Sequence, residues 1–192
     1  MSKRIALLSA AALGVLALTA AVVAPVSAQD KMKSEMSSEK TVMVGGAAMF
    51  PSKNIIQNAV NSKDHTTLVA AVKAAGLVDT LEGKGPFTVF APTNAAFGKL
   101  PAGTVDNLVK PENKATLTKI LTYHVVAGKL EASDLTDGKK LTTVQGEELT
   151  VKRSGSTVMI IDAKGDSSTV TIPNVNQSNG VIHVVDTVLM PS

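Results

Sequence analysis

The chain has 192 residues, no cysteine and a formal net charge of +3, a composition that excludes disulfides and thiolate metal sites. Of its 19 basic residues two, Lys3 and Arg4, lie at the amino terminus, which leaves 17 against 16 acidic residues in the rest of the chain. Because that balance is nearly neutral and no stretch concentrates Lys and Arg beside aromatic residues, the sequence lacks the electrostatic footprint of a nucleic-acid binder.

The amino-terminal residues have the pattern of a secretory signal. Lys3 and Arg4 precede an apolar run over residues 5–26, which ends in the small-residue sequence Val26-Ser27-Ala28. An apolar run of this length could also span a bilayer, but it is rich in alanine and interrupted by polar, glycine and proline residues. We therefore expect residues 1–28 to be a cleaved signal peptide and the protein to be exported to the periplasm, cell surface or extracellular space, with no membrane span after cleavage.

Residues 29–49 are expected to form a flexible tether. The first part, to about residue 41, is rich in Lys, Ser, Glu and Met and shows no hydrophobic periodicity, which is typical of a solvated segment. The second part, residues 42–49 with Gly45-Gly46, has no clear pattern and could pack loosely at the domain edge.

Helical patterns come next. Ser52 can cap a helix whose apolar face holds residues 55, 56, 59 and 60, and Thr66 or Thr67 can cap a second helix that Gly76 ends.

Residues 85–97 read as a strand that turns directly into a helix. Apolar residues occupy both faces of the 87–91 segment, which predicts a central strand covered on two sides. Pro92 cannot continue a strand ladder, so the strand ends there. Thr93 or Asn94 can then accept a hydrogen bond from the first free amides of the helix.

The second half of the chain changes from helical to alternating patterns. A helix starting near Pro111 runs to Tyr123-His124, and residues 148–152, 157–160, 169–172 and 181–185 follow as short strands separated by turns. Helices first and strands later, with one early strand, predict an α+β fold.

Three segments together resemble the fasciclin (FAS1) domain family. Residues 88–97 resemble its first signature block, residues 179–186 its second, and Tyr123-His124 its Tyr-His motif. The resemblance covers essentially one domain, residues 50–192. It implies a β-wedge with helices packed on it, a helical amino-terminal half and a β-rich carboxy-terminal half. It also implies a secreted, non-enzymatic module for adhesion or for interaction with the cell envelope or extracellular matrix.

The resemblance places partner contacts at Tyr123-His124 and at the loop that holds Pro173, Asn174, Val175 and Asn176. The expected partner is an extracellular or envelope protein, or a polysaccharide. Adhesive relatives carry aspartate at the position of Asn174, and an amide cannot supply that charge to a metal or a cation. Integrin-type binding through this loop is therefore not expected.

Alternative interpretations remain open. Tyr123 and His124 could be structural, the tyrosine packed in the core and the histidine bonded to the last carbonyls of its helix. The domain could carry an apolar small molecule such as a carotenoid, since it is rich in aliphatic residues. A hydrolase built from Ser178, His183 and Asp186 is disfavoured because no nucleophile-elbow sequence accompanies them. The histidines lack metal-site spacing, and no cofactor is expected.

Overall fold

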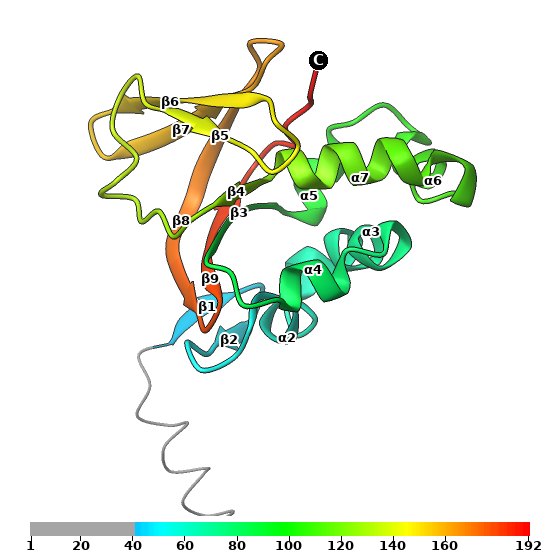
Figure 1. The fold of residues 1–192 in the computed structure, drawn as a ribbon, viewed down its shortest axis with the longest axis horizontal. Helices are drawn as coiled ribbons and strands as arrows, with labels where there is room; N and C mark the ends of the chain where they lie inside the picture. The colour runs from blue at the N-terminus through cyan, green and yellow to red at the C-terminus, as the bar shows by residue number, and fades with distance from the viewer. Residues whose placement is uncertain (1–40) are drawn as a thin grey trace, which may run out of the picture.

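The computed structural model describes residues 41–192, so the predicted signal peptide and residues 29–40 of the predicted tether lie outside the described residues. Seven strands form one mixed sheet in the order β4-β3-β9-β8-β7-β6-β5 (Figure 1). The strands are β3 (Phe87–Pro92), β4 (Val125–Ala127), β5 (Lys140–Thr142), β6 (Glu148–Ser154), β7 (Thr157–Ile161), β8 (Ser167–Gln177) and β9 (Gly180–Val185). A bridge between Val126 and Thr143 brings the two edges together, so the sheet curls into a near-barrel.

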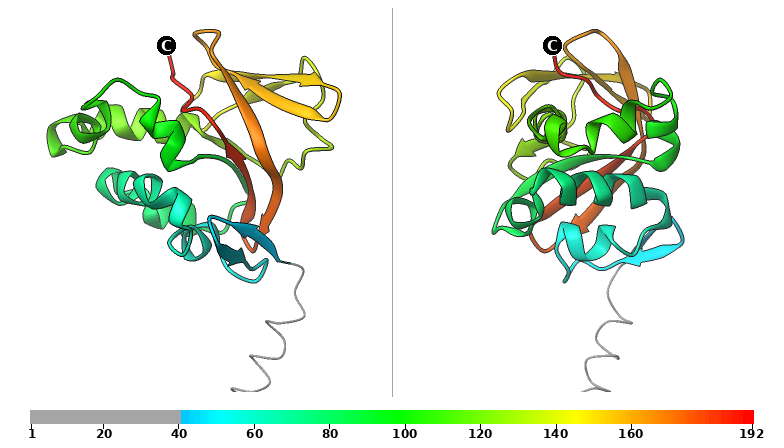
Figure 2. Two further views of the ribbon diagram at one scale, coloured as in Figure 1. Left: turned by 180° about the vertical axis from the view of Figure 1, so that it is seen from behind. Right: turned by 90° about the vertical axis from the view of Figure 1, so that its right-hand side faces the viewer.

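The helices gather on one side of this sheet, as the two views of Figure 2 show. They are α2 (Ile55–Ala59), the 3₁₀ turn η1 (Lys63–His65), α3 (Thr66–Ala75), α4 (Val78–Glu82), α5 (Asn94–Gly98), α6 (Thr104–Leu108), η2 (Pro111–Asn113) and α7 (Lys114–Tyr123). The helices precede the strands from β5 onward, which confirms the predicted α+β class and its helical first half. No helix within residues 41–192 has both the length and the apolar character needed to cross a bilayer.

Strand β3 lies at the centre of the fold. It pairs antiparallel with β4 and parallel with β9, where Phe87 is opposite Gly180 and Pro92 is opposite Val185. Phe90 belongs to the apolar cluster inside the curled sheet, whereas Val89 and Ala91 belong to the cluster beneath the helices. The prediction of a central strand covered on both faces is confirmed.

One helix cap differs from the predicted residue, and a second is confirmed. The side chain of Asn54, rather than Ser52, caps α2, because Asn54 Oδ1 accepts from the Gln57 amide at 2.8 Å. Thr93 caps α5 through Oγ1, which accepts from the Ala96 amide at 3.2 Å. Asn94 instead reaches helix α3, where its Oδ1 accepts from the Thr67 amide at 3.0 Å.

Asn179, at the β8–β9 turn, joins that turn to two helices. Its Oδ1 accepts from the Ile55 amide at 3.1 Å, and its Nδ2 donates to the carbonyls of Leu81 and Gly83 at 2.6 and 3.0 Å. The side chain therefore satisfies orphan backbone groups at the start of α2 and the end of α4. This explains why an asparagine is needed immediately before strand β9.

Residues 42–49 form a β-hairpin rather than the end of a flexible tether. Strands β1 (Val42–Val44) and β2 (Ala47–Met49) pair antiparallel around Gly45-Gly46, both of which have positive φ. Val44 and Met49 are buried against the domain, and this burial holds the hairpin in place. The boundary between tether and domain therefore lies before Val42, not at residue 50.

Candidate functional site

The predicted contact pair Tyr123-His124 lies in the interior. Tyr123 is 0% exposed and His124 2% exposed, so neither side chain offers surface to a partner in this conformation. The Tyr123 hydroxyl accepts from the Ala163 amide at 2.8 Å and is 3.4 Å from the Glu148 carbonyl. A role in partner contact stays a prediction for both residues, and the contacts observed are structural.

Both ring nitrogens of His124 are bonded, which determines its tautomer. The Leu189 amide donates to Nε2 at 3.0 Å, so the proton lies on Nδ1, which donates to the Ile120 carbonyl at 2.8 Å. Burial lowers the pKa of His124 to about 4, outweighing the opposing effects of the Ile120 carbonyl and Asp162. The imidazole is thus a neutral link between the end of α7 and the carboxy-terminal segment.

Acid should destabilise the protein through His124. The pKa of His124 is about 4 in the folded state, below the ordinary value of 6.5 that applies to the unfolded chain. The stability that the neutral imidazole gives the folded state is therefore complete above pH 6.5 and is lost as the pH falls toward 4. Linkage gives a loss of about 2 kcal/mol between pH 7 and pH 5. Denaturant unfolding at the two pH values should show a smaller loss in His124→Gln than in the unmodified protein. Equal losses in both proteins would contradict this assignment.

The predicted loop divides between two environments. Pro173, Asn174 and Asn176 line a surface groove of about 540 Å³, together with Val42, Met49, Pro51 and Glu131. Val175 points the other way, is 1% exposed and packs in the core beneath the helices. Residues 173–176 lie in strand β8, at a register shift in its pairing with β9, and not in a loop as predicted. Three of the four predicted contact residues reach the surface, at a site bounded by the β1–β2 hairpin. We call this site the hairpin groove.

Asn174 is held in an unusual backbone conformation at the hairpin groove. Its φ is +57°, a left-handed value that asparagine tolerates better than most residues. Its amide donates to His183 Nδ1 at 3.4 Å, while Nε2 of the same ring donates to the Leu130 carbonyl at 2.8 Å. Asn174 Oδ1 accepts from the Ala132 amide at 2.7 Å. His183, buried and stacked on Phe90, therefore joins two walls of the groove.

These bonds also separate the residues of the hydrolase alternative. Both nitrogens of His183 face backbone groups of Leu130 and Asn174, so the ring has no nitrogen left for Ser178 or Asp186. Asp186 instead accepts from the Thr169 amide at 2.8 Å and lies 3.6 Å from Lys99. Within residues 41–192 there is also no group of three or more His, Asp or Glu side chains placed to hold a metal ion.

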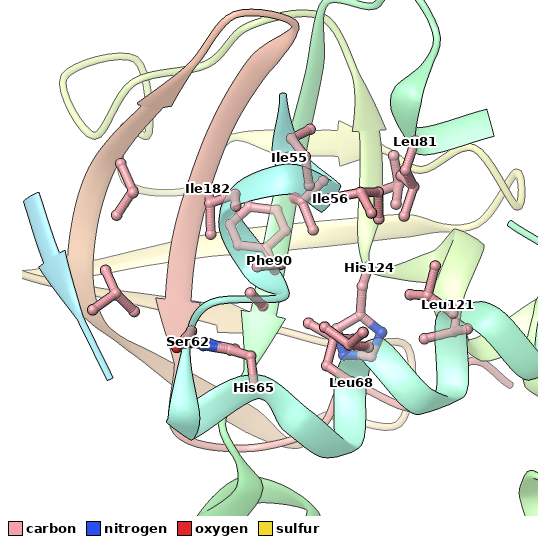
Figure 3. A pocket seen from close by; sticks show the side chains of 18 of the residues that line it. Ile55, Ile56, Ser62, His65, Leu68, Leu81, Phe90, Leu121, His124 and Ile182 are labelled. Atoms are coloured by element: carbon pink, nitrogen blue, oxygen red, sulfur yellow. Dashed lines mark hydrogen bonds between the residues drawn. The ribbon is translucent and has the colours of Figure 1, made fainter. Parts of the chain in front are cut away.

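A second hollow lies inside the molecule, between helices α2 and α3 and strands β3 and β9. It has a volume of about 40 Å³, and all its lining residues except Ser62, His65 and His124 are apolar. Figure 3 shows Ile56, Leu68 and Leu121 around it, with Ser62 and His65 side by side. We call it the apolar cavity; composition alone did not predict it, because its walls come from segments far apart in the chain.

His65 is the unusual residue of the apolar cavity. It is 3% exposed, its Nδ1 is bonded to Ser62 Oγ at 2.9 Å, and its Nε2 makes no hydrogen bond. Burial lowers the pKa of His65, although the Ala91 carbonyl and Asp64 act in the opposite direction. A buried nitrogen without a partner costs about 1–3 kcal/mol. The sequence offered no signal for this arrangement beyond a histidine beside a helix start.

The arrangement of a curled mixed sheet with helices on one side is that of a FAS1 domain. A solved structure of a FAS1 domain pair from the insect cell adhesion molecule fasciclin I matches with a TM-score of 0.65 at 20% identity, over 73% of this chain and 52% of that one. The family model for the fasciclin domain matches residues 63–191. The chain therefore belongs to the fasciclin domain family.

Relatives of high similarity come from bacteria. Protein sll1483 of Synechocystis sp. is 48% identical over 155 residues, which cover 81% of this chain and 83% of that protein. Cell surface glycolipoprotein MPB83 of Mycobacterium bovis is 41% identical over 153 residues, which cover 77% of this chain and 64% of the relative.

Proposed function

We propose that this protein is an exported, non-enzymatic module that binds a cell-envelope or extracellular-matrix partner, a protein or a polysaccharide, through the hairpin groove. The observation that carries the proposal is the groove itself, in which Pro173, Asn174 and Asn176 line about 540 Å³ of open space. Ligand-binding pockets are commonly about 300–1,000 Å³. Membership of the fasciclin family and the similarity to the cell surface glycolipoprotein MPB83 support an extracytoplasmic setting.

The chemistry of the hairpin groove favours a partner that donates hydrogen bonds. Asn176 Oδ1 is buried and has no hydrogen-bond partner, and Glu131 adds a carboxylate at the rim. Pro51 and Pro173 supply rigid apolar surface beside these acceptors. An apolar floor with a few polar groups is the usual composition of a binding surface, because the polar groups determine orientation and the apolar area supplies affinity.

Reversing the charge of Glu131 should weaken binding. In Glu131→Arg, retention of the purified protein on cell-wall, polysaccharide or matrix preparations should fall at least about fivefold, equivalent to roughly 1 kcal/mol. Stability should change little, because the Glu131–Lys129 ion pair is exposed and 3.5 Å long. Glu112→Arg is the matched control, since Glu112 is exposed on η2 outside the groove and its replacement changes the net charge equally.

The proposal fails if the unmodified protein is retained on none of these preparations. It also fails if Glu131→Arg and Glu112→Arg lose retention equally, since that outcome indicates a general charge effect rather than contact at the groove.

The alternative of a carotenoid carrier has less support. The apolar cavity holds about 40 Å³, whereas pockets for drug-sized ligands hold roughly 300–1,000 Å³. A long pigment would require the helices and sheet to move apart. Organic extraction of protein purified from its native source should therefore release no carotenoid.

A further inference from the structure

We propose that the apolar cavity binds a small apolar molecule that carries one hydroxyl group, which enters when the β1–β2 hairpin lifts and pairs with His65 Nε2. This site differs from the hairpin groove, although Met49 lines both, and it does not depend on the adhesion proposal. Val44 and Met49 of the hairpin are part of the cavity wall.

The walls select an apolar body. Side chains from helices α2, α3 and α7 and from strands β3 and β9 line the cavity, and they are aliphatic apart from Phe90, Ser62 and two histidines. His124 cannot serve a ligand, because both its nitrogens are already bonded to backbone groups of Ile120 and Leu189. A charged ligand would therefore lose its hydration without compensation.

His65 selects the polar group. Ser62 Oγ occupies Nδ1, and Nε2 is left without a partner in a residue that is 3% exposed. Which ring nitrogen carries the proton depends on the direction of the Ser62–His65 bond. A ligand hydroxyl can accept from a protonated Nε2 or donate to an unprotonated one, so it satisfies either tautomer. A ketone or an ether can only accept and would pair with one tautomer alone.

The hairpin is the element best suited to open. Its strands have three residues each, and an isolated two-stranded hairpin is marginally stable. The hairpin also lies outside residues 63–191, the part of the chain that matches the fasciclin family model, so it is an addition at the edge of that domain. Gly45 packs directly on the turn that holds His65: its carbonyl accepts from the Lys63 amide at 3.2 Å. A methyl group on Gly45 would overlap Ser62 Oγ and lie 2.7 Å from the Asp64 amide nitrogen.

The small volume of the cavity explains why entry needs this motion. A volume of about 40 Å³ accepts a water or a methyl-sized group, not a ring. Lifting Val44 and Met49 removes one wall and adds their volume to the site. The ligand class is therefore a compact alcohol or phenol rather than a long chain.

A pair of probes that differ by one hydroxyl tests the chemistry. Titrations followed by NMR should show 4-ethylphenol binding at least about fivefold more tightly than ethylbenzene, as expected for one added hydrogen bond. Shifts should concentrate at Val44, Met49 and His65. In His65→Phe, which keeps a ring but removes the nitrogens, 4-ethylphenol should lose this advantage and bind no more tightly than ethylbenzene, because its hydroxyl is then buried without the histidine partner. Absence of binding by both probes, or an unchanged ratio in folded His65→Phe, would overturn the proposal.

Two glycine variants test the entry route without replacing His65 itself. Gly45 and Gly46 both have positive φ, at +57° and +75°, so alanine is strained at either position. Only Gly45 contacts the Ser62 turn, since nothing lies within 4 Å of a methyl group on Gly46. Association of 4-ethylphenol should be several times faster in Gly45→Ala than in Gly46→Ala. Equal rates in the two variants would exclude the hairpin as the entrance.

Discussion

Replacing Gly180 with alanine is expected to destabilise the protein by about 3 kcal/mol or more, as severe overpacking does. Gly180 opens β9 and lies opposite Phe87 in the parallel β3–β9 pair. A methyl group there would overlap the Phe87 carbonyl oxygen and lie 2.9 Å from the carbonyl carbon. These are backbone atoms, which cannot rotate away, so the two central strands must separate. Denaturant unfolding of the variant measures the loss.

Gly98→Ala is the matched control for this experiment. Gly98 is the last residue of α5, and a methyl group there would meet nothing within 4 Å. The variant should be unchanged or more stable by up to about 1 kcal/mol, because alanine restricts the unfolded chain. Similar stabilities for Gly180→Ala and Gly98→Ala would show that β9 does not approach β3 as closely as described.

The features that the sequence predicted correctly are mostly local ones. Alternation over residues 87–91 predicted a strand with two apolar faces, and the structure places Phe90 in one apolar cluster and Val89 in the other. Gly76 was predicted to end a helix and does so in a left-handed conformation, with φ of +72°. Both predictions follow from short-range periodicity and backbone sterics, and all the residues that determine them lie within one short segment.

The features that the sequence missed depend on distant contacts. Asn94 looked suitable as a cap for the helix that follows it, yet it bonds to Thr67, 27 residues earlier. Residues 42–49 are mostly apolar but lack the alternation of apolar and polar residues that indicates a strand, so they did not predict a packed hairpin. The structure shows that Val44 and Met49 are buried against the domain. Parallel pairing of β3 with β9 joins the two signature blocks, which no local pattern contains.

The candidate site shows the same division. The resemblance located residues 173–176 but took them for a loop. Because they lie in strand β8, strand alternation could have shown that Val175 points away from Asn174 and Asn176. The burial of Tyr123 agrees with the structural alternative given for it, but the partner of its hydroxyl could not be predicted, because Ala163 is 40 residues away. The free nitrogen of His65 likewise depends on which distant groups fail to reach it.

The hairpin connects the two proposed sites. Met49 lines both the hairpin groove and the apolar cavity, with Val42 on the groove side and Val44 on the cavity side. A hairpin that lifts to admit a ligand would therefore remove one wall of the groove. Under the two proposals, a ligand in the cavity favours the lifted position of the β1–β2 hairpin, whereas a partner in the groove favours the closed position. Linkage then requires that each weakens the binding of the other.

Phe90→Ala should cost about 3–5 kcal/mol, the range for removal of a buried aromatic ring. Phe90 is 0% exposed and lies against His183, with ring centroids 5.7 Å apart and planes at 26°. The ring lies between the apolar cluster inside the curled sheet and the apolar cavity. Its removal would therefore leave a space that is continuous with the cavity, and the surrounding strands would not move in to fill it. Thermal or denaturant unfolding gives the loss directly.

Phe50→Ala provides the comparison of the same residue type at the domain edge. Phe50 is half-buried, and its ring lies 4.8 Å from Lys53 Nζ. Its removal should cost about 1 kcal/mol, since an exposed cation–π contact contributes about 0.5–1 kcal/mol. The two losses should differ because surrounding residues close over the space left at position 50, whereas position 90 has packed side chains on both sides of strand β3. Losses of equal size would mean that β3 is not the strand on which both apolar clusters depend.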